Sequence, residues 1–354
     1  MKPYCPETSG ASMVTRYTLM SLTAEAAAAT LILSILRRHV SGDRLILLIL
    51  LYNILSVGLR VLFSLLADNV SEKHAGVRLS VLLLVGGFVS PVALGVTLKV
   101  VLAAAGIAAF HAFAFSSVLA RSDFRARDVG FPAAGAALGT FFSRAYPFFG
   151  YLAALLCLML AIPGDSGDSR PVCLAHRLPR SPKIKWAPAA ILLLLGAVTL
   201  GSYLVSSLPP VGNGWKMYLA IGAALAVGRA VGGLISDRIG VSATLAVALG
   251  GGTLLPILKP GSAPAALAAL LLYSLAAAPL TALLFTLMPR FPGGAASLTA
   301  AAAYLGTALS HFSPLAAGSR PIAAALLLIT AAAVDLALLI ASHRAAGKEV
   351  ADHA

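Results

Sequence analysis

Long apolar runs alternate with short polar segments along almost the whole chain. Each run ends at charged residues, glycine or proline and is long enough to cross a bilayer as a helix. In lipid only helices and closed barrels satisfy their own backbone hydrogen bonds, and these runs are too long and too uniformly apolar for barrel strands. The sequence therefore predicts an all-α polytopic membrane protein with about twelve transmembrane helices, at 18–36, 45–66, 79–95, 97–120, 129–146, 148–163, 187–207, 215–236, 243–258, 263–288, 294–315 and 321–342.

The one long polar stretch between these runs, 164–186, separates the sixth from the seventh. It contains five lysines and arginines and no apolar run. We therefore predict three parts: an N-terminal six-helix bundle at 1–163, a cytoplasmic central loop at 164–186, and a C-terminal six-helix bundle at 187–354.

The two predicted bundles carry matching polar positions. Arg60 and Asp68 recur as Arg229 and Asp237, an offset of 169 residues that is close to half of the 354-residue chain. A second repeat has an offset of 167 residues. In it Leu138-Gly139-Thr140, Ser143 and Pro147 recur as Leu305-Gly306-Thr307, Ser310 and Pro314. Parallel repeats of this kind predict two halves related by a pseudo-twofold axis along the membrane normal.

The composition fits a protein whose main solvent is lipid. Hydrophobic residues make up 59% of the chain and charged residues 11%, with a mean hydropathy of +0.91. A soluble domain carries about 25% charged residues. The net charge of +13 is spread over short loops without a basic run, so we expect no nucleic-acid partner.

The loop charges also predict an orientation. With both termini cytoplasmic, the cytoplasmic segments hold sixteen lysines and arginines and the opposite side eight. This bias follows the positive-inside rule. We expect a multi-pass protein of the plasma membrane, specifically a bacterial inner membrane, with both termini in the cytoplasm.

One loop carries a recognisable motif. Between the eighth and ninth runs the chain has Gly233, Asp237, Arg238 and Gly240 in the spacing G-x-x-x-D-R-x-G, which resembles the loop motif of the major facilitator superfamily. A weaker copy between the second and third runs keeps Asp68 but has Ser64 and Asn69 in place of the glycine and arginine. The resemblance implies two six-helix bundles that move against each other around a central substrate site.

In the family this motif lies on the cytoplasmic side. The resemblance therefore implies a conformational latch, which we assign to Arg60, Asp68, Arg229, Gly233, Asp237, Arg238 and Gly240. Glycine allows helices to approach closely, and an aspartate at a helix end can pair with a basic group or with the positive N-terminus of another helix. The alternative is that Asp68 and Asp237 only end their helices among lipid headgroups.

Charged residues inside predicted spans are candidates for function because a charge at the bilayer centre is costly. Glu25 falls in the first span and His111 in the fourth, and the family resemblance implies that both spans line the central cavity. Either side chain can carry a coupled proton. The structural alternatives are an ion pair for Glu25 and an interhelical hydrogen bond for His111. The span-four arginine of the family's proton antiporters is replaced by Leu102, so coupling has to use other groups.

Four further basic groups lie within or at the ends of spans. We expect Arg60 and Arg229 to pair with Asp68 and Asp237 or with neighbouring backbone, the alternative being an anion site in the cavity. Arg144 and His311 occupy positions related by the offset of 167 and are candidates for substrate or gating contacts. Snorkelling at a helix end explains Arg144 equally well.

These observations favour a transporter that moves a small organic solute by alternating access, proton-coupled efflux being one form of that activity. We expect a monomer without cofactor or metal. Its partners are the solute and the lipid bilayer, and protons as well where the activity is proton-coupled. A non-transporting scaffold or receptor with the same fold is the main alternative. A membrane-embedded enzyme is disfavoured, because the seven histidines are dispersed and no convergent polar constellation is evident.

Overall fold

The computed structural model describes residues 8–70, 72–91, 95–121, 125–162, 186–206, 214–259, 261–288, 291–312 and 319–352. Within these ranges, side chains are described except at 8–12, 120, 121, 292, 311, 312, 320 and 338–352. The described residues form helices joined by short turns and bends and contain no strand. The all-α prediction is therefore confirmed.

The described helices form twelve rods. The N-terminal six are α1 (Thr8–Thr30) continued by η1 (Leu31–Ile35) and α2 (Leu36–His39), then α3 (Gly42–Asn69), α4 (Lys73–Val89), α5 (Val96–Arg121), α6 (Ala126–Ala145) and α7 (Phe149–Ala161). The C-terminal six are α9 (Ala187–Ser206), α10 (Trp215–Ile239), α11 (Val241–Leu258), α12 (Ala263–Leu275) continued by α13 (Ala277–Leu287), α14 (Pro292–Phe312) and α15 (Arg320–Asp352).

Seven of the described helical segments are long and apolar enough to cross a membrane. On several helices the side chains that face outwards are large and apolar; on α3 they include Ile46, Leu47, Leu50, Ile54 and Leu62. Such surfaces would be unfavourable in water but suit a hydrocarbon solvent. The chain is thus a multi-pass membrane protein.

Some helix boundaries differ from those predicted from hydropathy. The third span was expected at 79–95, but α4 runs from Lys73 to Val89. The helix includes polar residues before the apolar run, which hydropathy alone does not count. It ends early because Pro91 disfavours helical backbone at the preceding Ser90, whose ψ is 135°.

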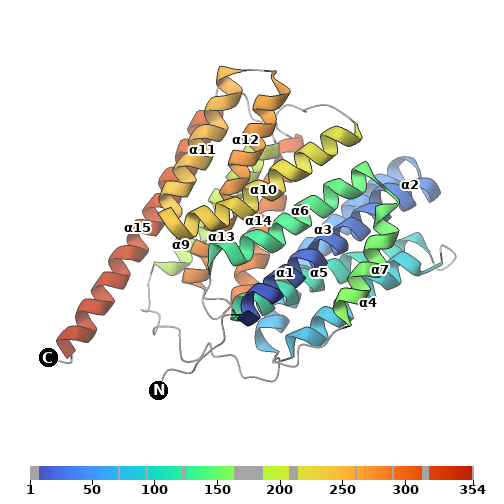
Figure 1. The fold of residues 1–354 in the computed structure, drawn as a ribbon, viewed down its shortest axis with the longest axis horizontal. Helices are drawn as coiled ribbons and strands as arrows, with labels where there is room; N and C mark the ends of the chain where they lie inside the picture. The colour runs from blue at the N-terminus through green and yellow to red at the C-terminus, as the bar shows by residue number, and fades with distance from the viewer. Residues whose placement is uncertain are drawn as a thin grey trace.

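The same pairs of rods pack together in each half. Within the N-terminal half α1 packs on α6 and α7, α3 on α5, and α4 on α5 and α7. The equivalent rods of the C-terminal half repeat this pattern, with α9 on α14 and α15, α10 on α12, and α11 on α12 and α15. Figure 1 shows the two groups side by side, with α6 and α10 adjacent where they meet. The boundary of the central loop falls at residues outside the description, so the three-part division stays a prediction.

Each half has its own apolar core. In the N-terminal half Met20, Leu84 and Phe110 are fully buried, and in the C-terminal half Leu194 and Leu249 are. Two seams join the halves: α6 packs against α10 and α13, and α14 packs against α3 and α5. The candidate site lies along these two seams.

Candidate functional site

Two carboxylates join the halves at one end of the bundle. Asp237, in the last turn of α10, accepts hydrogen bonds from the backbone N–H of Ala126 at 2.8 Å and of Arg127 at 3.3 Å. These are among the first N–H groups of α6, which have no partner inside their own helix. The carboxylate therefore caps the positive end of a helix that belongs to the other half.

Asp68 makes the corresponding contact on the second seam. It lies near the end of α3 and accepts hydrogen bonds at 2.9 Å from the N–H of Gly293 and of Gly294, in the first turn of α14. The Ser116 hydroxyl of α5 donates a further hydrogen bond at 2.9 Å. Gly293 and Gly294 stand 167 residues after Ala126 and Arg127, so the two contacts are equivalent under the repeat.

The two glycines of the motif explain how α10 can lie so close to the start of α6. A Cβ at Gly233 would lie 2.7 Å from the Ala126 carbonyl oxygen and from the Arg127 Cα. Only glycine lets α10 come this near to the start of α6. Gly240 has a φ of 88° and serves as the turn between α10 and α11, a conformation that other residues rarely adopt. Arg238 is exposed in the last turn of α10.

We expected the in-span arginines to pair with these aspartates or with neighbouring backbone, and the described partner of Arg229 is a backbone carbonyl. An eight-residue separation on one helix puts the two Cα atoms about 12 Å apart along the axis, too far for a direct contact. Arg229 instead donates a hydrogen bond of 2.9 Å to the Ala133 carbonyl of α6, across the seam. Arg60 is buried, and its Nε has no hydrogen-bond partner among the described residues.

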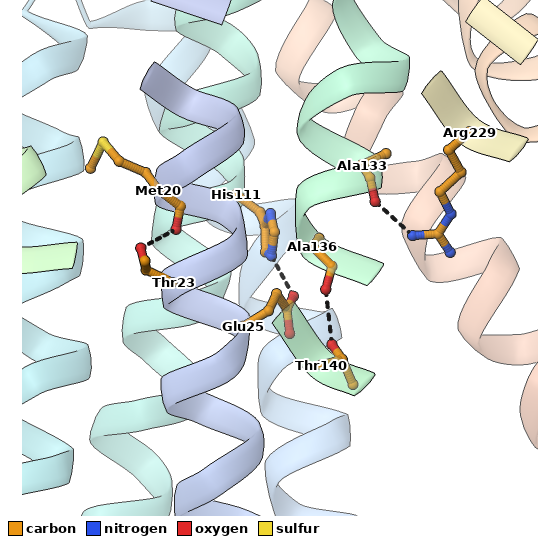
Figure 2. A network of polar contacts seen from close by, with 8 residues as sticks. All are labelled: Met20, Thr23, Glu25, His111, Ala133, Ala136, Thr140 and Arg229. Atoms are coloured by element: carbon orange, nitrogen blue, oxygen red, sulfur yellow. Dashed lines mark hydrogen bonds and ion pairs between the residues drawn. The ribbon is translucent and has the colours of Figure 1, made fainter. Parts of the chain in front are cut away.

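Glu25 and His111 meet inside the N-terminal half. The Glu25 Oε1 of α1 lies 2.6 Å from the His111 Nε2 of α5 (Figure 2). The side chains are 15% and 4% exposed. The His111 Nδ1 is buried and has no described partner, and the ring packs between Phe110 and Phe115. The sequence pointed to each residue separately; the helix packing joins them into one pair.

The pair belongs to a wider polar group that we call the central cluster: Glu25, Tyr52, Arg60, His111, Arg229 and Tyr304. Both arginines interact electrostatically with Glu25, as do the two tyrosines. Tyr304, on α14, interacts with Arg60 and with Arg229 and is 39% exposed. The cluster thus draws side chains from both halves.

The sequence reasoning missed both tyrosines. A usable signal existed for Tyr52, because Tyr52, Ser56 and Arg60 recur at four-residue intervals in an apolar span and so share one face of α3. No comparable signal marked Tyr304. Its place in the cluster follows from how α14 packs against α3.

The other two candidates lie apart from these contacts. Arg144, near the end of α6, is exposed, and its guanidinium lies 5.0 Å from the centre of the Phe141 ring. It interacts electrostatically with Tyr218 of α10. His311 lies in the last turn of α14, and its side chain is outside the described residues.

Solved transporter structures share this arrangement of rods. The E. coli fucose:proton symporter FucP aligns with a TM-score of 0.61 at 14% identity, over 93% of this chain and 98% of that one. A second FucP structure, an MFS transporter in the outward conformation, gives 0.57 at 16% identity over 92% and 98%. The chain has the major facilitator superfamily fold.

A human relative of this fold extends the comparison. The organic anion transporter MFSD10 (TETRAN) aligns with a TM-score of 0.55 at 17% identity. The alignment covers 96% of this chain and 100% of MFSD10. No family model and no curated protein sequence matches the chain. At these identities the likeness establishes the fold, and the chemistry has to be argued from the residues described above.

Proposed function

We propose that the protein is a secondary transporter that moves a small organic solute across the membrane by alternating access. The observation that carries the proposal is the pair of carboxylate caps, Asp68 on α14 and Asp237 on α6. Each bridges the halves at the end of the bundle predicted to be cytoplasmic. Each can break without unfolding a helix, because only end groups of the capped helix are involved.

The geometry supports a rocking motion of the halves. While both caps are made, the halves are held together at that end. Their loss would let the halves separate there and open the central cluster to that side of the membrane. Two equivalent, charge-assisted contacts that exist in one state and not in the other are a physical means of setting the populations of the two states.

We further propose that transport is proton-coupled and that the Glu25–His111 pair holds the proton. The contact of 2.6 Å joins an acid and a base that can share or exchange one proton. The pair lies beside residues of both halves, so its surroundings change when the halves move. The same fold serves proton symport in FucP, so it accommodates such coupling.

Transport should be tested with purified protein in proteoliposomes. Thermal stabilisation of the protein by metabolites and antibiotics, measured at two pH values, would first identify the solutes that bind. The uptake of these solutes would then be followed with and without a pH gradient. We expect saturable movement that the gradient accelerates. Solutes that bind and are never moved, with cysteine accessibility unchanged on both faces, would identify a non-transporting receptor. Chemical conversion of a bound solute would identify an enzyme.

The proposal includes a monomer in the plasma membrane of a bacterium, with both termini cytoplasmic. Labelling of single cysteines introduced at Lys2 and Lys348 with a membrane-impermeant reagent tests the orientation. We expect both to be protected in intact cells and labelled after permeabilisation.

A further inference from the structure

The central cluster contains more positive than negative charge. Arg60 and Arg229 are two guanidiniums, and both interact electrostatically with the carboxylate of Glu25. The carboxylate of Glu25 also contacts the His111 ring at 2.6 Å. With His111 neutral, the described cluster carries a net charge of +1, and with the pair protonated it carries +2.

Arg60 has a buried hydrogen-bond donor for which no acceptor is described. Its side chain comes from the middle of α3 and is 8% exposed, and its Nε has no hydrogen-bond partner among the described residues. A buried N–H donor without an acceptor is unfavourable unless a further acceptor is supplied. Because Glu25 already contacts His111, an anion bound from solution would suit the Arg60 Nε as that acceptor.

The neighbours of Arg60 fit an organic anion. A guanidinium matches a carboxylate through two parallel N–H donors, and Arg229 offers a second guanidinium from the other half. The phenols of Tyr52 and Tyr304 add hydroxyl donors, and Tyr304 interacts with both arginines. The Phe115 ring stacked on His111 gives the cluster an apolar surface. Because the arginines belong to different halves, an anion between them would contact both.

We propose that Arg60 and Arg229 bind the carboxylate of a monoanionic organic solute, and that the Glu25–His111 pair takes up a proton together with it. This inference rests on the proposed transport function and names its substrate class. Protonation of the pair adds one positive charge next to the anion, so each ligand favours the binding of the other. One proton then accompanies one monoanion, and the direction of transport follows from the two gradients.

Charged and titratable groups reach the pair from several helices. Tyr52 and Arg60 come from α3, Arg229 from α10 and Tyr304 from α14. The other helices packed on α1 carry Arg144 on α6, Cys157 on α7 and His74 on α4.

The experiment measures binding to purified protein by calorimetry, with acetate, lactate and benzoate as probes. Acetamide, lactamide and benzamide are uncharged controls of the same shape. We expect the acids to bind and the amides not to, with an affinity about 5- to 100-fold higher near pH 5.5 than near pH 7.5. Parallel titrations in buffers of different ionisation enthalpy should show proton uptake with the carboxylate, approaching one per anion near pH 7.5.

Variants separate the parts of the proposal. Arg60→Gln and Arg229→Gln should each lose tenfold or more in carboxylate affinity, while Arg60→Lys, which keeps the charge, should retain more of it. Arg44→Gln is the matched control, because Arg44 lies at the exposed start of the same helix, α3. In Glu25→Gln the side chain is neutral at every pH, so the cluster keeps the net charge of +2 that it has in the wild type when the pair is protonated. It should bind carboxylates near pH 7.5 as tightly as the wild type does near pH 5.5, without proton uptake.

Several results would overturn this inference. They are equal binding of acids and amides, unchanged affinity in both arginine variants, affinity independent of pH, and binding of chloride or nitrate without preference for the organic acids. Failure of every acid to bind the folded wild type would also overturn it. If a neutral solute is nevertheless transported in proteoliposomes, the proposed function stands and only the substrate class fails.

Discussion

Asp68 and Asp237 cap helices of opposite halves through equivalent contacts. Each carboxylate accepts two backbone N–H groups, Asp68 from Gly293 and Gly294 and Asp237 from Ala126 and Arg127. The two contacts join the halves at one end through charge-assisted hydrogen bonds. Removing either carboxylate should therefore change the equilibrium between the two transport conformations while leaving each six-helix bundle intact.

Asp237→Asn should weaken one cap and favour the state that is open at that end. The variant loses the charge and one of two acceptor oxygens, which corresponds to about 1–2 kcal/mol. The population ratio of the two states should shift roughly 5- to 30-fold. The measurement is labelling of single cysteines on each face, together with the rate of solute uptake, which should fall.

Asp335→Asn is the control for this variant. Asp335 accepts a hydrogen bond of 2.6 Å from Ser242 inside the C-terminal half, so its loss should leave the balance between the halves unchanged. Equal labelling patterns in wild type and Asp237→Asn would show that the cap does not hold the halves together.

Gly233→Ala should disturb the same seam sterically. The added methyl group would lie 2.7 Å from backbone atoms of Ala126 and Arg127, so α10 and α6 would have to separate. We expect a larger shift than in Asp237→Asn, because the displaced helix also pulls Asp237 away from its donors. Gly250→Ala is the matched control, since nothing lies within 4 Å of a Cβ at that position. If both substitutions have the same effect on cysteine labelling, close packing at Gly233 is not what joins the halves.

Glu25→Gln should uncouple transport from the proton gradient. The amide keeps a hydrogen-bonding group opposite His111 Nε2 but cannot hold the transferable proton. Exchange of solute across the proteoliposome membrane should continue, while accumulation driven by a pH gradient should be lost. Gradient-driven accumulation at the wild-type level would make Glu25 a structural residue.

His111→Gln separates the two members of the pair. The amide nitrogen can still donate a hydrogen bond to Glu25, but the second titratable group is gone. If Glu25 is the primary proton site, the dependence of uptake on pH should be retained with a shifted midpoint. A pH profile that becomes flat in His111→Gln and stays unchanged in Glu25→Gln would reverse the assignment.

The sequence alone determined the membrane fold and its repeat. Twelve apolar runs predict helices because lipid leaves an exposed backbone no other way to satisfy its hydrogen bonds. The offset between Asp68 and Asp237 identified the two halves, and the G-x-x-x-D-R-x-G spacing singled out Gly233 and Gly240. All of these signals are local or periodic, so they can be read along the chain without knowing which helices are neighbours.

Only the tertiary structure decided the partners. The backbone donors to Asp68 come from Gly293 and Gly294 at the start of α14, and those to Asp237 lie at the start of α6, so neither set is marked by any local pattern. His111 and Glu25 are 86 residues apart and meet because α1 and α5 pack together. Within the described part of the chain no acceptor meets the Nε–H of Arg60, and Asp68, two turns away, faces the other half. Hydropathy says which residues enter the membrane, but the contacts inside it are set by which helix faces meet.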